Sequence, residues 1–223
     1  MFFPPLLFIF MVVFFFILLF LFGLVHVGVI SYAFQKVGIG PEHMFSLLFF
    51  SLVGSYVNIP IKRMPCETLM IERTIVSYFG FRFRIPTYVR ERESILAVNL
   101  GGAIIPLLIS LYLLFKTGIF FGVLMATMVV ALIVHKLSRL VPGMGITVPA
   151  LIPPVVAAIA AIILAPSNSP PVAYISGTMG TLIGADILNL GKIKRLNAPV
   201  ASIGGAGTFD GIFFTGIMAV LLA

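Results

Sequence analysis

The chain has 223 residues, of which 61% are hydrophobic and only 9% are charged, and its mean hydropathy is +1.20. Because soluble domains have about 25% charged residues, this composition excludes a soluble globular protein and indicates a polytopic membrane protein. The formal net charge of +7 comes from basic residues in loops between apolar runs. It therefore indicates contact with membrane lipids, including anionic headgroups, and not nucleic-acid binding. We expect a single all-α transmembrane domain over residues 1–223.

Seven apolar runs are each close to the roughly 20 residues that cross a bilayer as a helix. The Ser31-Tyr-Ala33 sequence after the first run resembles a signal-peptide cleavage site, but no basic residue precedes that run and it is too long for a signal sequence. We expect a retained first span. In the fifth run, prolines and glycines between Pro142 and Pro154 predict an interrupted or kinked helix. The expected spans are about 6–30, 44–60, 95–115, 117–135, 146–165, 171–190 and 203–223.

The basic residues of the loops predict the orientation of these spans. With seven crossings, the loops on one side carry only Lys36 and Lys116. The loops on the other side carry twelve basic residues, and basic loops stay in the cytoplasm. We therefore expect a multi-pass protein of the plasma (inner) membrane with its N-terminus inside and Ala223 outside. The twelve residues are Lys62, Arg63, Arg73, Arg82, Arg84, Arg90, Arg92, Lys136, Arg139, Lys192, Lys194 and Arg195.

The only long loop, residues 61–94, is basic and is expected on the cytoplasmic side. Its segment Phe79-Gly-Phe81-Arg-Phe83-Arg-Ile85 alternates apolar and polar residues with the period of a strand. Two interpretations stay open: a short β-hairpin at the membrane surface, and an amphipathic interfacial segment that anchors Arg and Phe side chains at the headgroups.

The two aspartates are the acidic residues that fall within predicted spans, since all five glutamates lie in loops. An ionisable residue inside the membrane is costly and marks a candidate functional site. Asp186 lies about five residues before the cytoplasmic end of the sixth span, and Asp210 lies about seven residues into the seventh. At 1.5 Å per residue both are roughly 7–10 Å deep on consecutive antiparallel helices. We therefore expect the two carboxyls to meet.

A polar pocket is expected around the two acids. Asn189 shares a helix face with Asp186, Asn58 and Asn99 lie at comparable depth, and the small residues before Asp210 allow another backbone to approach. A structural alternative remains, in which Gly204-Gly-Ala-Gly207 is a non-helical entry to the last span and Asp210 lies near a helix N-terminus. The expected pocket residues are Asn58, Asn99, Asn189, Gly207, Thr208 and Gly211.

Two neighbouring carboxyls share one proton, because both cannot ionise cheaply. One ionised and one protonated carboxyl can activate water and polarise a peptide carbonyl, as in aspartic proteases. The same proton can instead be passed along a relay, as in a proton-coupled carrier or channel.

Two stretches carry a family resemblance. Gly184-Ala-Asp186-Ile-Leu-Asn189-Leu and Gly204-Gly-Ala-Gly-Thr-Phe-Asp210-Gly-Ile-Phe-Phe-Thr-Gly-Ile resemble the signature of an uncharacterised prokaryotic membrane family, "domain of unknown function 1614". That resemblance covers most of the chain and implies no activity. A weaker resemblance is to the presenilin and signal-peptide-peptidase type of intramembrane aspartyl protease. It implies that Asp186 and Asp210 are a catalytic dyad.

The leading hypothesis is an intramembrane aspartyl protease-like protein that cleaves a transmembrane peptide near the cytoplasmic face, with Asp186 and Asp210 as its catalytic residues. The alternatives are a proton-coupled transporter or channel that uses the same two acids, and a non-catalytic scaffold or complex subunit. No cofactor or metal is expected, because Cys66 is the single cysteine and His26, His43 and His135 are dispersed. A homo-oligomer is possible.

Overall fold

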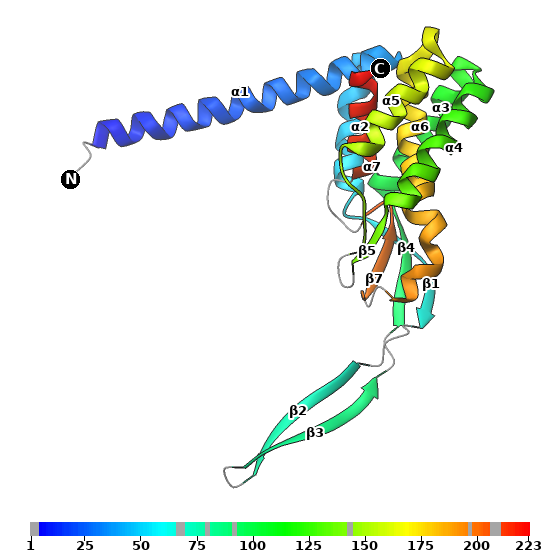
Figure 1. Ribbon diagram of the computed structural model, residues 1–223. Helices are drawn as coiled ribbons and strands as arrows, with labels where there is room; N and C mark the ends of the chain where they lie inside the picture. The colour runs from blue at the N-terminus through cyan, green and yellow to red at the C-terminus, as the bar shows by residue number, and fades with distance from the viewer. Residues whose placement is uncertain are drawn as a thin grey trace.

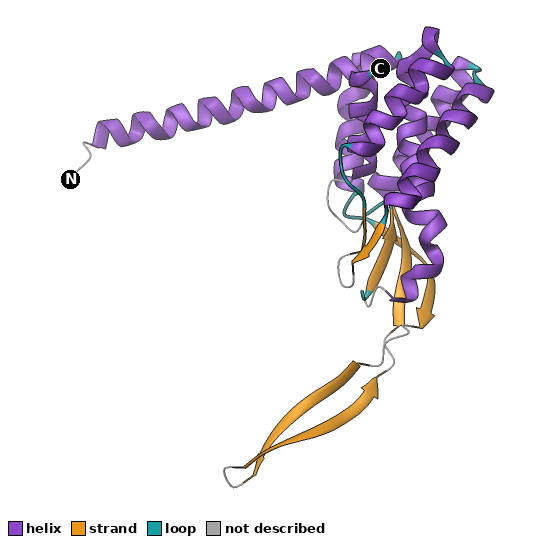
Figure 2. Ribbon diagram, viewed as in Figure 1, coloured by secondary structure: helices purple, strands orange, loops and turns teal. Residues whose placement is uncertain are grey.

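The computed structural model is mostly helical, with a small β-sheet at one end of a helical bundle (Figure 2). It describes residues 5–65, 70–78, 81–90, 93–141, 145–195, 198–205 and 211–223. Seven α-helices lie in these ranges, and each falls largely within one of the apolar runs predicted from the sequence. They are α1 (Pro5–Val37), α2 (Pro41–Gly54), α3 (Ile105–Thr117), α4 (Phe120–Leu137), α5 (Ile152–Leu164), α6 (Ser169–Thr181) and α7 (Gly211–Leu222).

Helix α6 is the centre of the bundle, and helices α3, α4, α5 and α7 pack around it. Small residues on α6 allow this close packing. A Cβ atom at Gly180 would lie 2.6 Å from the Val130 side chain of α4, and one at Gly177 would lie 3.3 Å from both Ala157 of α5 and Ala219 of α7. Because lipid tails are as apolar as the side chains, such small-residue contacts are a main source of helix association in membranes.

Among the residues that the structure describes, three helical segments are long and apolar enough to cross a membrane: Met11–Val37, Leu100–Thr117 and Phe120–Leu137. The apolar helices Ile152–Leu164 and Gly211–Leu222 are shorter. The protein is therefore a membrane protein, as its composition predicts. The count of seven spans stays a prediction, since α2 has only 14 residues and α6 only 13.

Helix α1 contacts the bundle only near its C-terminal end, and the rest of the helix extends away from it (Figure 1). Ala33 and Phe34 are buried in the core, the Phe34 ring lies 6.4 Å from that of Phe213, and Lys36 Nζ donates to the Val220 carbonyl oxygen at 3.4 Å. The sequence Ser31-Tyr-Ala33 is therefore part of a continuous helix that packs on α7, and retention of the first span stays a prediction.

A three-stranded sheet caps one end of the bundle, and the all-α prediction missed it. Strand β1 (Asn58–Pro65) pairs antiparallel with β4 (Glu93–Asn99), and β4 pairs parallel with β7 (Val200–Ile203). The predicted spans 44–60, 95–115 and 203–223 were therefore too long at their sheet ends. Figure 1 shows this sheet at the end of the bundle opposite the C-terminus.

Two further hairpins lie in the connections at the same end. Strands β2 (Met70–Tyr78) and β3 (Phe81–Arg90) pair antiparallel, so the hairpin interpretation of the loop 61–94 is correct. Its location at a membrane surface stays a prediction. A short hairpin of β5 (Arg139–Val141) and β6 (Gly145–Thr147) precedes α5.

The start of α5 differs from the predicted fifth span of 146–165. Residues 145–147 form β6, and the helix begins at Ile152. Pro153 and Pro154 occupy its first turn, where a missing N–H breaks no hydrogen bond. These two prolines therefore start the helix and do not kink it.

Candidate functional site

Two π-helical turns lie where the bundle meets the sheet. The first, η1 (Leu100–Ile104), joins β4 to α3, and the second, η3 (Leu182–Asp186), continues α6 and leads into the 3₁₀ segment η4 (Ile187–Arg195). Single π turns inside helices are rare and occur often at functional sites. Asn99 and Asp186, two of the residues predicted for the pocket, lie at the start of η1 and at the end of η3.

Asn99 is 1% exposed and uses both ends of its amide. Its Oδ1 accepts from the Gly102 backbone N–H at 2.7 Å, which caps η1. Its Nδ2 donates to the Ser55 carbonyl oxygen at 2.6 Å and to Asn58 Oδ1 at 3.1 Å. Asn99 therefore joins the end of α2, the start of β1 and η1.

The structure brings Asn58 and Asn99 together, since the two residues are paired in the β1–β4 register. Asn58 Oδ1 also accepts from the Ser202 hydroxyl at 2.6 Å. Ser202 lies on β7, and the sequence analysis did not single it out. The sequence offers little indication of Ser202, because one serine among apolar residues predicts neither a strand nor a site.

Asp186 is partly buried and accepts a hydrogen bond from β7's C-terminal end. Its Oδ2 lies 2.8 Å from the backbone nitrogen of Gly204. Gly204 has a φ of +84°, and a Cβ atom there would lie 2.6 Å from the Ala103 Cβ and 2.7 Å from the Ala103 nitrogen. Position 204 therefore requires glycine for two reasons: its backbone has a positive φ, and η1 lies too close to leave room for a Cβ atom. The pair Gly204-Gly205 was a readable signal for a turn.

These contacts form one connected cluster, which we call the polar junction: Asn58, Asn99, Asp186, Ser202 and Gly204. Its members come from β1, β4, η3 and the end of β7. Side-chain hydrogen bonds join Asn58 to Asn99 and to Ser202, and the backbone N–H of Gly204 joins the end of β7 to the Asp186 carboxylate. Gly204 also contacts η1. It can hold a carboxylate in a fixed position between the membrane helices and the sheet.

Asn189 has different partners. Its Nδ2 donates to Ser138 Oγ at 2.9 Å and to the carbonyl oxygens of Gly184 and Ala185 at 3.0 and 2.9 Å. It is 1% exposed and ties η3 to the end of α4. The shared face with Asp186, which was predicted for a regular α-helix, is therefore replaced by a cap on the irregular turn.

Asp210, Gly207 and Thr208 lie outside the described residues. The described part of helix α7 is Gly211–Leu222, so the predicted position of Asp210 inside the last span stays a prediction. Residues 200–203 are a strand, and Gly204 and Gly205 have φ values of +84° and +87°. The entry to the last span is therefore non-helical at Gly204 and Gly205, and the rest of that alternative, up to Asp210, lies outside the described residues. Gly211 is exposed, and its carbonyl oxygen accepts from the Thr215 hydroxyl at 2.6 Å.

Both described flanks of residues 206–210 lie beside η3. On one side Gly204 contacts Asp186, and on the other side Ile212 packs in one apolar cluster with Leu182 and Ala103. Leu182 and Asp186 are the first and last residues of η3.

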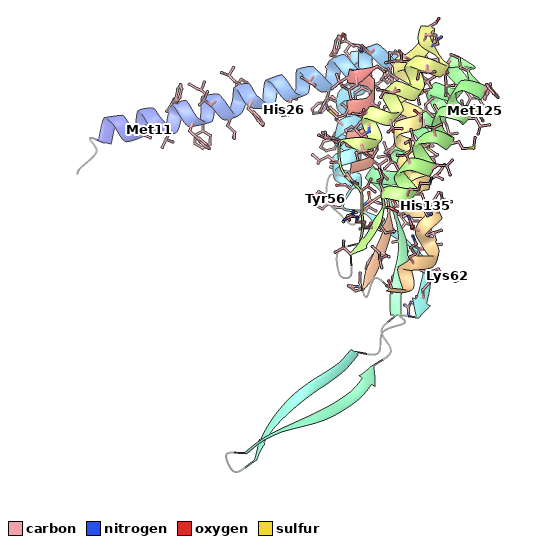
Figure 3. All side chains as sticks on the ribbon, in the orientation of Figure 1. Met11, His26, Tyr56, Lys62, Met125 and His135 are labelled. Carbon is pink, nitrogen blue, oxygen red and sulfur yellow. The ribbon has the colours of Figure 1, made fainter. Side chains whose placement is uncertain are left out.

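Within the described part of the chain, no group of three or more His, Cys, Asp or Glu side chains is arranged to hold a metal ion. Figure 3 shows His26 on α1, far from His135 near the sheet end of the bundle. Tyr56 and Lys62 are labelled in the same view near the sheet.

Comparisons with known proteins identify a family and no activity. Neither a curated protein nor a solved structure matches the chain. The resemblance to presenilin-type proteases therefore gains no support. Residues 52–222 match the family described as "Protein of unknown function (DUF1614)", which agrees with the stronger resemblance noted in the sequence. Since this match covers more than half of the chain, the protein belongs to the DUF1614 family.

Proposed function

We propose that the protein is an intramembrane aspartyl hydrolase in which Asp186 and Asp210 cleave a transmembrane peptide near the cytoplasmic face. One ionised carboxyl takes a proton from water as the water oxygen attacks the peptide carbonyl carbon. The other, protonated carboxyl donates its proton to the carbonyl oxygen, and proton transfer to the amide nitrogen then releases the amine. The products are a carboxylic acid and an amine, so the reaction needs no cofactor.

One observation carries this proposal: both described flanks of residues 206–210 lie against η3, which ends at Asp186. The Gly204 backbone N–H donates to the Asp186 carboxylate at 2.8 Å, and Ile212, two residues after Asp210, belongs to one apolar cluster with Leu182 and Ala103. A segment tethered at both ends beside Asp186 has Asp210 within its reach.

Access to the polar junction is also suitable for a substrate that lies in the membrane. Tyr56 and Val57, which directly precede Asn58, are 75% and 44% exposed. The junction is thus close to the outer surface of the bundle beside α2. A peptide could approach it laterally without passing through the packed core around α6.

The charge distribution supports the cytoplasmic location that we propose for the sheet end. Lys62 on β1, Arg139 on β5 and Lys192 on η4 belong to this end. At the opposite end, Lys36 donates to the Val220 carbonyl oxygen and Lys116 to that of Gly38. Under the positive-inside rule, seven crossings would then leave the N-terminus in the cytoplasm and the C-terminus outside. A reporter fused to Ala223 that is active only outside the cytoplasm tests this topology.

The decisive test uses proteoliposomes that contain the purified protein and a fluorescently labelled transmembrane peptide. We expect cleavage by the wild type and a loss of at least 100-fold in Asp186→Asn and in Asp210→Asn, since each removes one partner of the acid–base pair. Glu67→Gln is the matched control, because it makes the same change at an acid outside the predicted spans. Cleavage that survives either aspartate substitution would refute the proposal.

A second candidate function, proton-coupled transport through the same two acids, is favoured by a row of hydroxyls in α6. Tyr174, Thr178 and Thr181 follow one face of the helix and are at most 6% exposed. Their hydroxyls have no hydrogen bond of acceptable geometry among the described residues, although Tyr174 and Thr178 are neighbours. Thr181 directly precedes η3.

Buried hydroxyls without partners are costly and are often bridged by water, which can conduct protons. Transport predicts that a pH gradient across liposomes collapses with the wild type. It also predicts that the pH gradient collapses more slowly with Thr178→Val and persists with Asp186→Asn. Peptide cleavage together with an unchanged pH gradient would reject this second function.

A further inference from the structure

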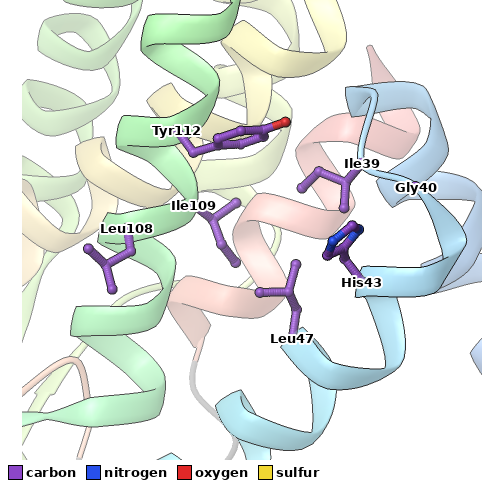
Figure 4. A pocket seen from close by; sticks show the side chains of 7 residues that line it. All are labelled: Ile39, Gly40, His43, Leu47, Leu108, Ile109 and Tyr112. Atoms are coloured by element: carbon purple, nitrogen blue, oxygen red, sulfur yellow. The ribbon is translucent and has the colours of Figure 1, made fainter.

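A continuous apolar groove runs along the seam between α2 and α3. Two cavities of about 330 and 350 Å³ lie in this seam and share Leu47, Leu108 and Ile109. Figure 4 shows the upper cavity, with Tyr112, Ile109 and Leu108 of α3 facing Ile39, His43 and Leu47 across the gap. The lower cavity reaches Gly54 and Val57, next to the polar junction.

The outer mouth of this groove carries two opposite charges. Lys116 Nζ donates to the Gly38 carbonyl oxygen at 2.5 Å and lies 5.6 Å from the centre of the Tyr112 ring. Glu42 lies against Gly40, where a Cβ atom would clash with its carboxylate, and its Oε1 is 3.3 Å from His43 Nδ1. Gly38 and Gly40 belong to one short loop, so the ammonium and the carboxylate flank the same opening.

We propose that this groove binds one phospholipid whose headgroup carries both a phosphate and a primary ammonium, with an acyl chain lying along the α2–α3 seam. Lys116 has three donors and uses one for Gly38, so two remain for the phosphate. The Glu42 carboxylate accepts from the lipid ammonium. The groove walls, which are almost entirely apolar, hold the acyl chain.

The length of the groove fits one leaflet. His43 and Gly54 are both in α2 and are eleven residues apart, which corresponds to about 16 Å along the helix. Half of a hydrocarbon core of about 30 Å is about 15 Å. The headgroup at the mouth and the acyl chain in the seam thus have the dimensions of one lipid.

The width of the groove disfavours a helix as its occupant. A helix of the same length and about 10 Å diameter occupies on the order of 1,200 Å³. The two cavities are each less than a third of that volume and partly overlap, since they share three lining residues. The enclosed space therefore matches a single flexible chain more closely than a whole helix.

Native mass spectrometry of the full chain in mild detergent tests this inference. Phosphatidylethanolamine, phosphatidylglycerol and phosphatidylcholine with identical acyl chains are added separately. We expect one phosphatidylethanolamine per chain and at least tenfold weaker binding of phosphatidylglycerol, which lacks the ammonium, and of phosphatidylcholine, whose ammonium has no N–H donor. Lys116→Gln and Glu42→Gln should each weaken phosphatidylethanolamine binding about tenfold.

A second pair of variants tests the groove itself. Leu108 lines both cavities and is 58% exposed, so Leu108→Trp should fill the seam without disturbing the core and reduce lipid binding at least tenfold. Leu111→Trp is the matched control, because Leu111 is exposed on the same helix but does not line the groove. Equal binding of the three lipids, no retained lipid, or equal effects of the two tryptophans would overturn the proposal. So would cross-linking from position 108 to a peptide or to a second copy in place of lipid.

Discussion

Replacing Gly204 by alanine should destabilise the protein strongly, because this glycine joins the sheet to η1 and holds Asp186. A φ of +84° costs a residue with a Cβ about 1–2 kcal/mol. The new methyl group would also lie 2.6–2.8 Å from Ala103 and from the Gly102 carbonyl carbon, and overpacking of this kind costs about 1–3 kcal/mol. The sum is about 3 kcal/mol, which for a chain of this length lowers the melting temperature by roughly 6–12 °C.

Alanine substitutions at two other glycines separate the backbone cost from the overpacking cost when all three variants are compared by thermal unfolding. Gly118 has a φ of +67° but nothing within 4 Å of its Cβ position, so Gly118→Ala carries only the backbone cost and should lower the melting temperature by roughly 2–8 °C. Gly191 has no positive φ and nothing within 4 Å of its Cβ position, so Gly191→Ala should change the melting temperature by less than about 2 °C. If Gly204→Ala melts at the same temperature as Gly118→Ala, the contact between Gly204 and η1 does not stabilise the fold.

Three further changes test the polar junction by thermal unfolding. Asp186→Ala leaves the buried Gly204 N–H without an acceptor and should cost about 2 kcal/mol, whereas Asp186→Asn keeps an acceptor oxygen and should stay within about 1 kcal/mol of the wild type. Equal losses would mean that this hydrogen bond is unimportant. Asn99→Ala removes three hydrogen bonds at a buried position and should cost about 3 kcal/mol; a loss below about 1 kcal/mol would contradict its linking role. Gly101→Ala should prevent α2 from packing on η1, because its methyl group would overlap the Ser51 carbonyl oxygen; wild-type yield and melting temperature would refute this.

The sequence predicts the helices well because the apolar runs are long and bounded by charged or turn-forming residues. Each predicted span contains one helix, and the hairpin at 70–90 follows the period-two alternation noted in the long loop. The sequence also predicts that Asn58 and Asn99 lie together, since both occur at the ends of spans on the same side.

The three-stranded sheet could not be predicted in the same way. Residues 95–98 and 200–203 are short, mostly apolar stretches at or beside the starts of predicted spans, and periodicity does not distinguish such strands from helix. The parallel pairing of β4 with β7 joins segments about 100 residues apart, which no local pattern reveals. The start of the last span was misjudged for this reason, because the strand β7 and the two glycines after it occupy its first predicted residues.

The position of Asn189 shows a second limit. Its spacing from Asp186 predicts a common face on an α-helix, but the backbone changes to π geometry at 182–186 and to 3₁₀ geometry afterwards. Both changes alter the rotation per residue, so spacing rules of the α-helix no longer apply. Asn189 then binds carbonyl oxygens of η3 and the Ser138 hydroxyl.

The pairing of Asp186 with Asp210 is tested most directly by disulfide cross-linking. In a Cys66→Ala background, which removes the single native cysteine, Asp186→Cys and Asp210→Cys are combined and oxidised in membranes. A disulfide requires Cα atoms about 4.4–6.8 Å apart, so we predict an efficient intramolecular cross-link for this pair and none for Ser138→Cys with Asp210→Cys. Absence of the first cross-link, or equal formation of both, would contradict a shared site for the two acids.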